Sequence, residues 1–151
     1  MSSLSDDDIA LTIEKFALPS TKHAFQGVFP LDQLPKSIRH HPCFIVINTQ
    51  SHNLPGEHWL AVYISIEKRG EIFDSLALPV SNYLRRWMNS HALKGWISSQ
   101  KVLQDWKSNS CGAFVIYYVL HRLNRKEMPF TYCKTMNDVL VKSFYHTLHE
   151  K

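Results

Sequence analysis

A cysteine stands where a polar stretch becomes an apolar one, in SNSCGAFVIYYVL (residues 108–120). Asn109 or Ser110 can cap a helix there, which places Cys111 in the first turn. Unpaired backbone N–H groups and the positive end of the helix dipole gather at that turn, and they favour the thiolate, the nucleophilic form of cysteine. Gly112 would let another chain approach the thiol closely. The alternative is a buried structural cysteine, which behaves as a small apolar residue.

A thiolate nucleophile needs a base, and His58 is the best placed of the nine histidines. It lies where the polar loop SHNLPGE (51–57) enters HWLAVYISI (58–66), an apolar run that predicts a strand. Catalytic groups are often found at such junctions, where a loop meets a strand of a rigid scaffold. For an isolated histidine, the alternative is an ordinary loop residue at a strand edge.

Asp74 interrupts the apolar run EIFDSL (71–76), where a carboxylate costs free energy unless it is paired. Two registers of the predicted hairpin are possible. If the turn centres near Glu67, Asp74 lies opposite Leu60 and shares a face with His58. If the turn centres on Lys68–Arg69, Asp74 lies opposite Tyr63 and points to the opposite face of the sheet from His58. Only the first register lets Asp74 orient the histidine, and the sequence leaves both open.

Acyl transfer also needs hydrogen-bond donors for the oxyanion that develops on the substrate carbonyl. Gln104 precedes the cysteine in the polar stretch QDWKSNSC (104–111). Its side-chain amide can reach the same point as the backbone N–H of Cys111. A lone glutamine in a loop is ordinarily solvated, so this prediction depends on the other three residues.

The order His58, Asp74, Gln104, Cys111, with the motifs HW, FDS and Q-x6-CG, resembles the adenain-like cysteine proteases. That family includes the adenovirus maturation protease and is related to the proteases of ubiquitin-like modifiers. FQGVFPLDQLP and FIVINTQSHNLPGEHWLAV extend the resemblance, which covers residues 5–125. It implies a general-base histidine, an orienting acid, an oxyanion-hole glutamine and a nucleophilic cysteine. It also implies that Trp59 packs beside the site, as one wall of a narrow cleft.

The sequence departs from adenain in three ways. Asp74 matches the acid of the ubiquitin-like-protein proteases, whereas adenain has a glutamate. The chain is also shorter than adenain after the cysteine. The adenain cysteine that binds an activating peptide falls near Leu93, so no disulfide is transferred, and Cys43 and Cys133 are read as structural or unpaired thiols. No cofactor is expected, and an activating peptide or DNA is implied by the resemblance alone.

Length and composition set the broad class. The chain has 151 residues, of which 44% are hydrophobic, and this predicts one domain over residues 1–151. No apolar run is long enough to span a membrane, and the acidic N-terminus lacks a signal-peptide pattern. Three cysteines are an odd number, which argues against a disulfide framework. We expect a monomer inside the cell, in the cytoplasm, nucleus or a virion, and not secreted.

The predicted elements give an α+β fold of the papain-like, adenain-like type. A small, mainly antiparallel sheet would pack against a central helix that carries the nucleophile. A capping serine followed by acidic residues predicts the first helix. The segments are helices starting at Ser5 and Ser81, strands at 43–49, 58–66, 71–76 and 100–106, and helices at 111–123 and 137–149.

These observations favour a thiol endopeptidase that cleaves precursor polypeptides of a virus or virus-like element. Small residues, often glycine, are expected around the scissile bond. The alternative is an isopeptidase for ubiquitin or a ubiquitin-like modifier, which shares the chemistry but has a different partner. A binding module or inactive relative fits the intact set of four residues less well. A metal protein fits less well still, because there is no C-x2-C pair and HTLH (146–149) alone is a poor zinc signature.

The formal charge of +4 permits contact with nucleic acid without requiring it. If the local basic groups formed a face beside the active site, the enzyme could follow a nucleic acid. An ordinary solvated surface is the alternative. The groups are Arg85–Arg86, Lys94, Lys101 and Arg122–Arg125–Lys126.

Overall fold

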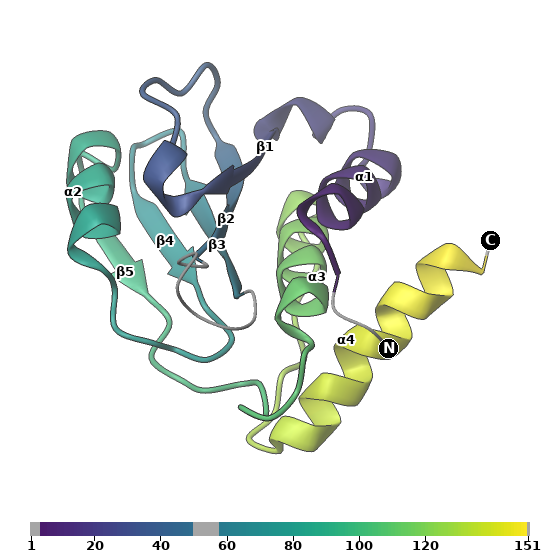
Figure 1. The fold of residues 1–151 in the computed structure, drawn as a ribbon. Helices are drawn as coiled ribbons and strands as arrows, with labels where there is room; N and C mark the ends of the chain where they lie inside the picture. Colours follow the sequence, from purple (N-terminus) through teal and green to yellow (C-terminus); the bar gives the residue numbers. More distant parts are fainter. Residues whose placement is uncertain (1–3, 50–57, 151) are drawn as a thin grey trace.

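The structure is a computed structural model that describes residues 4–49 and 58–150, so the predicted loop 51–57 lies outside it. The described residues form an α+β fold with a five-stranded sheet, as predicted (Figure 1). The strands, in sheet order, are β1 (Phe25–Pro30), β2 (Cys43–Asn48), β3 (Trp59–Ile64), β4 (Gly70–Phe73) and β5 (Trp96–Ser98). The helices are α1 (Asp6–Phe16), α2 (Asn82–His91), α3 (Cys111–Leu123) and α4 (Lys134–His149), with short 3₁₀ turns at Lys22–Ala24 and Leu31–Gln33. None of the described helices is both long and apolar enough to cross a membrane.

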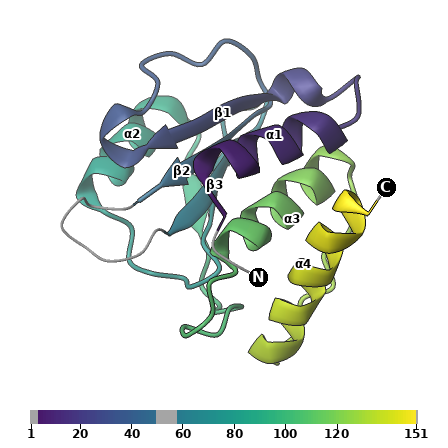
Figure 2. The same cartoon turned by 45° about the vertical axis from the view of Figure 1, so that its right-hand side comes forward.

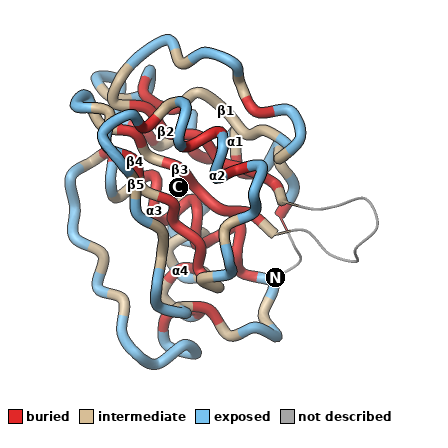
Figure 3. Tube along the Cα trace, turned by 90° about the vertical axis from the view of Figure 1, so that its left-hand side faces the viewer, coloured by how far each residue is buried: buried red, intermediate tan, exposed pale blue. Residues whose placement is uncertain are grey.

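The sheet separates two hydrophobic cores. Helix α2 covers one face, while α1 and α3 cover the other and α4 packs on the outer side of α3 (Figures 1 and 2). Successive strand residues point to opposite faces. On β3, therefore, Leu60 and Val62 join the core under α2, and Trp59 and Ala61 join the core under α3. Helix α3 and the central strands are buried over most of their length (Figure 3).

The helix starts follow from local chemistry. At α1, the Ser5 hydroxyl accepts a hydrogen bond from the Asp8 N–H at 3.1 Å, and the Asp8 carboxylate accepts one from the Ser5 N–H at 2.9 Å. This capping box satisfies N–H groups that have no partner inside the helix. At α2, Ser81 accepts from the N–H of Leu84 at 3.2 Å. Both caps are confirmed.

The β3–β4 hairpin adopts the register that the site requires. Val62 pairs with Ile72 and Tyr63 with Glu71, which centres the turn on Glu67. Continuing the same pairing puts Asp74 on the face that carries His58. The first of the two possible registers is therefore confirmed.

The edges of the sheet differ from the prediction. The sheet is mixed: β1 pairs with β2 in parallel, and β4 pairs with β5 in parallel. Strand β1 was not predicted because a register shift and Gly27, with φ 124°, interrupt its alternation. Strand β5 has only three residues, and the strand expected at 100–106 is irregular. Tyr83 and Leu93 are 45% and 70% exposed, because α2 buries its 84, 87 and 88 face and ends before Leu93.

At Gly70, β4 passes close to Met88, Ala92 and Trp96. A Cβ added there would lie 2.7 Å from both Ala92 Cβ and Met88 Cε and 3.0 Å from Trp96 Cβ. Because packed interiors tolerate extra atoms poorly, we expect Gly70→Ala to lower the free energy of unfolding by about 1–3 kcal/mol. Urea denaturation measures it, with Glu67→Ala as comparison because Glu67 is exposed in the turn of the same hairpin. Wild-type stability in Gly70→Ala would contradict the packing described here.

Candidate active site

The histidine and the acid meet at one end of the central hairpin. Strand β3 begins just after His58 and β4 ends just before Asp74, so the antiparallel pairing brings both to the same end. His58 Nε2 lies 2.8 Å from Asp74 Oδ1, and the two side chains are 17% and 6% exposed. The predicted hydrogen-bond contact between them is confirmed.

The Asp74 carboxylate is fixed from two further directions. Its Oδ1 accepts from the N–H of Leu76 at 2.9 Å, and its Oδ2 accepts from the N–H of Leu78 at 3.2 Å. The backbone N–H of Asp74 donates to Ser99 Oγ at 3.0 Å. Burying a carboxylate is costly unless it is hydrogen-bonded, and these contacts offset that cost. They also hold the carboxylate in one orientation toward His58.

The cysteine completes the group. Helix α3 begins at Cys111, at the same end of the sheet as the start of β3 (Figure 1). The thiol residue is 5% exposed, and His58 makes a hydrogen bond to it as well as to Asp74. The structure therefore brings an acid, an imidazole and a thiol into one continuous chain of contacts.

The charge state of His58 reflects both partners. Burial alone lowers its pKa, but the hydrogen bonds and negative charges of Asp74 and Cys111 raise the pKa of His58 to about 9. The protonated imidazole is therefore the stable form at neutral pH. A protonated imidazole beside a thiol is the partner that stabilises a thiolate.

The other two cysteines differ from Cys111. All three fall within the described residues and none forms a disulfide. Burial raises the pKa of the Cys43 thiol to about 11, so Cys43 stays protonated at neutral pH. Cys133 is exposed at the start of α4.

Gln104 is linked to the site from both sides. It is 1% exposed, and its Oε1 accepts from Ser75 Oγ at 2.6 Å. Its Nε2 donates to the carbonyl oxygen of Ser108 at 3.2 Å and to Ser108 Oγ at 3.1 Å. A carbonyl oxygen can only accept, so this contact fixes which end of the amide carries the nitrogen. Gln104 therefore lies between Ser75, the neighbour of Asp74, and the loop that leads into Cys111.

Two residues expected at the cleft are packed inside the protein. Trp59 shares a core cluster with Cys111, so it does pack beside the site. It is 1% exposed and its indole N–H donates to Asp6 Oδ1 at 2.5 Å, so it does not form an open cleft wall. At Gly112, an added Cβ would lie 3.2 Å from Leu4 Cβ and 3.4 Å from Ile9 Cδ1. The chain that approaches this glycine is thus the protein's own N-terminal segment. Both corrections arise from tertiary packing.

Sequence reasoning missed two buried polar residues on α4. Asn137 and Asp138 are 1% and 7% exposed, and both bond to the loop before α3. A signal was present: Asp138 lies three residues before Val141, which is buried, so both share one helix face. Within residues 4–49 and 58–150, no group of three or more His, Cys, Asp or Glu side chains is placed to hold a metal ion.

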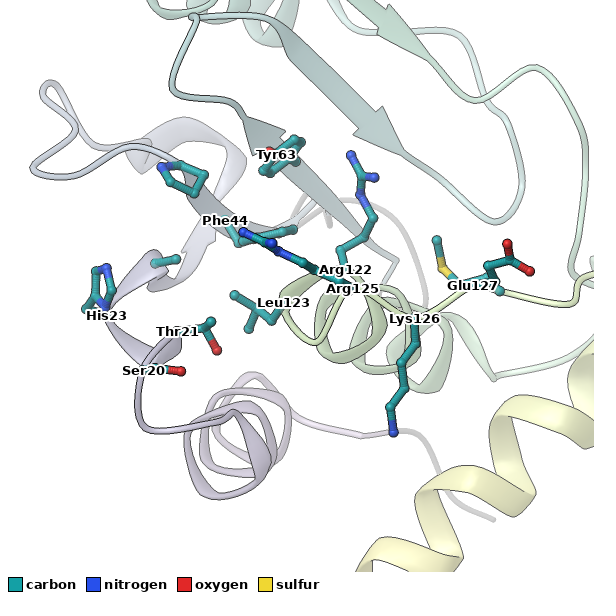
Figure 4. A pocket seen from close by; sticks show the side chains of 13 residues that line it. Ser20, Thr21, His23, Phe44, Tyr63, Arg122, Leu123, Arg125, Lys126 and Glu127 are labelled. Carbon is teal, nitrogen blue, oxygen red and sulfur yellow. The ribbon is translucent and has the colours of Figure 1, made fainter.

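One basic group lies away from the site. Arg122, Arg125 and Lys126 help to line a cavity of about 670 Å³ at the C-terminal end of α3, with Phe44 and Tyr63 (Figure 4). Cys111 is at the other end of this helix, roughly 18 Å away along its axis. This group therefore does not form a face beside the thiol.

Comparison with known proteins gives matches among solved structures. No protein-family model matches the chain, and no curated protein matches it. ASFV pS273R protease matches with a TM-score of 0.60 and 16% identity, over 83% of this chain and 59% of that one. ChlaDub1 from Chlamydia trachomatis matches with a TM-score of 0.51 and 18% identity, over 71% and 61%. The central domain of Lpg1148 from Legionella pneumophila matches with a TM-score of 0.56 and 13% identity, over 100% of both chains.

These likenesses show that the chain has a cysteine protease fold, as the sequence predicts. The chain spans 59% and 61% of the lengths of the ASFV protease and ChlaDub1. The resemblance to adenain in particular stays a prediction.

Proposed function

We propose that this chain is a cysteine endopeptidase that cleaves precursor polypeptides. Cys111 is the nucleophile, His58 the acid and base, Asp74 the residue that orients the histidine, and Gln104 an oxyanion-hole donor. The observation that carries the proposal is the chain of hydrogen bonds from the Asp74 carboxylate through His58 to the thiol at the start of α3. The fold shared with the ASFV protease supports it.

Acylation starts from the thiolate and the imidazolium. Cys111 Sγ attacks the carbonyl carbon, a C–S bond forms, and one electron pair of the carbonyl moves to its oxygen. The backbone N–H of Cys111 donates to that oxyanion, and one N–H of Gln104 exchanges its Ser108 acceptor for the same oxygen. Since His58 Nε2 bonds to Asp74, Nδ1 is the nitrogen that faces the sulfur. As the C–N bond breaks, His58 gives its proton to the leaving nitrogen, and the acyl group remains on Cys111 as a thioester.

Deacylation returns the enzyme to its starting state. Neutral His58 takes a proton from water while the water oxygen attacks the thioester carbonyl. The C–S bond then breaks, the acid product leaves, and the thiolate and imidazolium are restored. Asp74 holds the ring and stabilises its positive charge, and it does not take up the proton itself.

Gln104 is expected to act on the transition state. An amide donor aimed at an oxyanion contributes about 2.7–4 kcal/mol, so Gln104→Ala should lower kcat by about 10²–10³ with a modest change in KM. Steady-state kinetics measure both constants. Gln33→Ala is a matched control because Gln33 is exposed. If KM rose while kcat held, Gln104 would be a substrate contact instead.

The substrate class is open between two candidates. Asp74, the acid type of the ubiquitin-like-protein proteases, favours an isopeptidase as the second candidate. A substrate panel distinguishes the endopeptidase from the isopeptidase. It contains precursor peptides with glycine around the scissile bond and ubiquitin-like conjugates, and Cys111→Ala is the negative control. Peptide cleavage supports the endopeptidase. Release of a modifier without peptide cleavage moves the assignment to the isopeptidase.

The same assays, run with and without DNA, test the activation that the resemblance implies. Binding through phosphates releases counterions, so any affinity for DNA should fall steeply as salt rises. The group Arg122, Arg125 and Lys126 lies at the far end of α3. DNA held there would therefore bind without covering Cys111.

A further inference from the structure

A buried carboxylate on α4 faces the loop that leads into α3. Asp138 Oδ1 accepts from Ser110 Oγ at 2.7 Å and from Ser108 Oγ at 3.2 Å. Its Oδ2 accepts from the N–H of Asp105 at 3.3 Å. Among the described residues, Asp138 has no cation within ion-pair distance. A buried carboxylate without a cation depends on hydrogen bonds to offset its desolvation.

This carboxylate sets the direction of a chain of hydrogen bonds, because an ionised carboxylate can only accept. The Ser110 hydroxyl donates its hydrogen bond to Asp138 Oδ1. The Ser108 hydroxyl donates either to Asp138 Oδ1 or to Ser110 Oγ, which lies 2.7 Å from Ser108 Oγ. In both cases the Ser108 oxygen is left to accept from Gln104 Nε2 at 3.1 Å. The chain therefore turns the amide nitrogen of Gln104 toward the loop before Cys111.

The same contact changes the cap of α3. A serine at the N-cap ordinarily accepts a hydrogen bond from an N–H group of the first turn. Ser110, one of the two predicted cap residues, is the N-cap, but its side chain makes no capping bond. Its hydroxyl is turned to Asp138 instead. The side chain of the cap residue thus does not occupy the N–H groups of the turn that carries Cys111.

The backbone of the loop is held from the same helix. Asn137 Nδ2 donates to the carbonyl oxygens of Leu103 at 3.1 Å and Thr131 at 2.8 Å. Asn137 and Asp138 together fix the segment 103–110 at both of its ends. Helix α4 lies beyond residues 5–125, the part of the chain that carries the sequence resemblance.

We infer that Asp138 is a positioning residue for the oxyanion hole, which acts through Ser108 and Ser110 on Gln104 and on the first turn of α3. This inference rests on the proposed function. It assigns a kinetic role to a residue that lies behind the loop and does not touch substrate.

Asp138→Asn tests the direction of the chain with little change in shape. The new amide nitrogen is a donor, so the asparagine side chain cannot accept hydrogen bonds at both of its terminal atoms as the Asp138 carboxylate does. The hydroxyls of Ser108 and Ser110 are then no longer forced to donate toward residue 138. We expect kcat to fall by about 10-fold, a part of the 10²–10³ that a whole oxyanion donor contributes, while KM stays within about twofold. Amide hydrogen exchange over residues 105–112 should speed up in the same variant.

A second variant separates positioning from plain stability. Val141 is fully buried on the same helix, so Val141→Ala loosens the packing of α4 without removing any of these hydrogen bonds. We expect it to keep the wild-type kcat. An equal loss of kcat in Val141→Ala would reduce Asp138 to a packing role and overturn the inference.

The two proposals can fail separately. If the wild type cleaved nothing in the substrate panel, the proposed function would fail, and hydrogen exchange would still report on the loop. Unchanged exchange over 105–112 in Asp138→Asn would overturn the positioning role whatever the activity.

Discussion

Replacing Cys111 by alanine should lower turnover by on the order of 10⁶-fold, the loss seen when a covalent nucleophile is removed. The expectation follows from geometry: this thiol begins α3 and hydrogen-bonds to His58, whose pKa is raised to about 9. No step of the proposed reaction proceeds without the sulfur. Peptide cleavage followed by mass spectrometry measures the loss.

The other thiols supply the controls. Burial raises the pKa of Cys43 to about 11, and Cys133 is exposed just before α4. Cys133→Ala is the cleaner comparison because the side chain is solvated, and Cys43→Ala should also retain turnover. Full activity in Cys111→Ala would remove the protease proposal.

Asp74→Asn should lower kcat/KM by about 10²–10⁴, because asparagine cannot stabilise the imidazolium and permits the wrong ring orientation. The substitution keeps the shape of the side chain, so the protein should still fold. Asp32→Asn makes the same chemical change at an exposed position and should have no effect.

The pH profile gives this prediction a second readout. Burial lowers the pKa of His58, and Asp74 and Cys111 together raise it to about 9. The active form carries the proton on His58, so activity in the wild type should fall as pH rises through about 9. Without the charge of Asp74, the same fall should occur at lower pH. Because His58 and Cys111 interact, the apparent pKa of this alkaline fall in activity belongs to the pair and not to either residue alone. An unchanged alkaline limb in Asp74→Asn would contradict the role of Asp74.

The sequence predicted the parts of this site that depend on local chemistry. The start of α3 at Cys111 follows from a polar stretch that meets an apolar one, and the caps at Ser5 and Ser81 follow from hydroxyls at helix starts. The hairpin register was narrowed to two choices. Turn composition could not decide between them, because Lys68 adopts the left-handed conformation, with φ 68°, and the nearby Gly70 does not.

The surroundings of the site depend on contacts between distant segments. Trp59 is buried and bonded to Asp6, and Gly112 lies against Leu4. Both contacts need the N-terminal segment in place, and nothing in the local sequence encodes them. Asp138 reaches Ser110 from the other end of the chain in the same way.

The most direct test of the central claim is to trap the acyl-enzyme. The wild type is mixed with an activated ester of a peptide that the panel shows to be cleaved, quenched in acid within the first turnover, digested and analysed by mass spectrometry. The account predicts the mass of the acyl group on the peptide that contains Cys111, and no such adduct in Cys111→Ala. Cleavage without an adduct at Cys111, or an adduct on Cys43, Cys133 or any other residue, would contradict it.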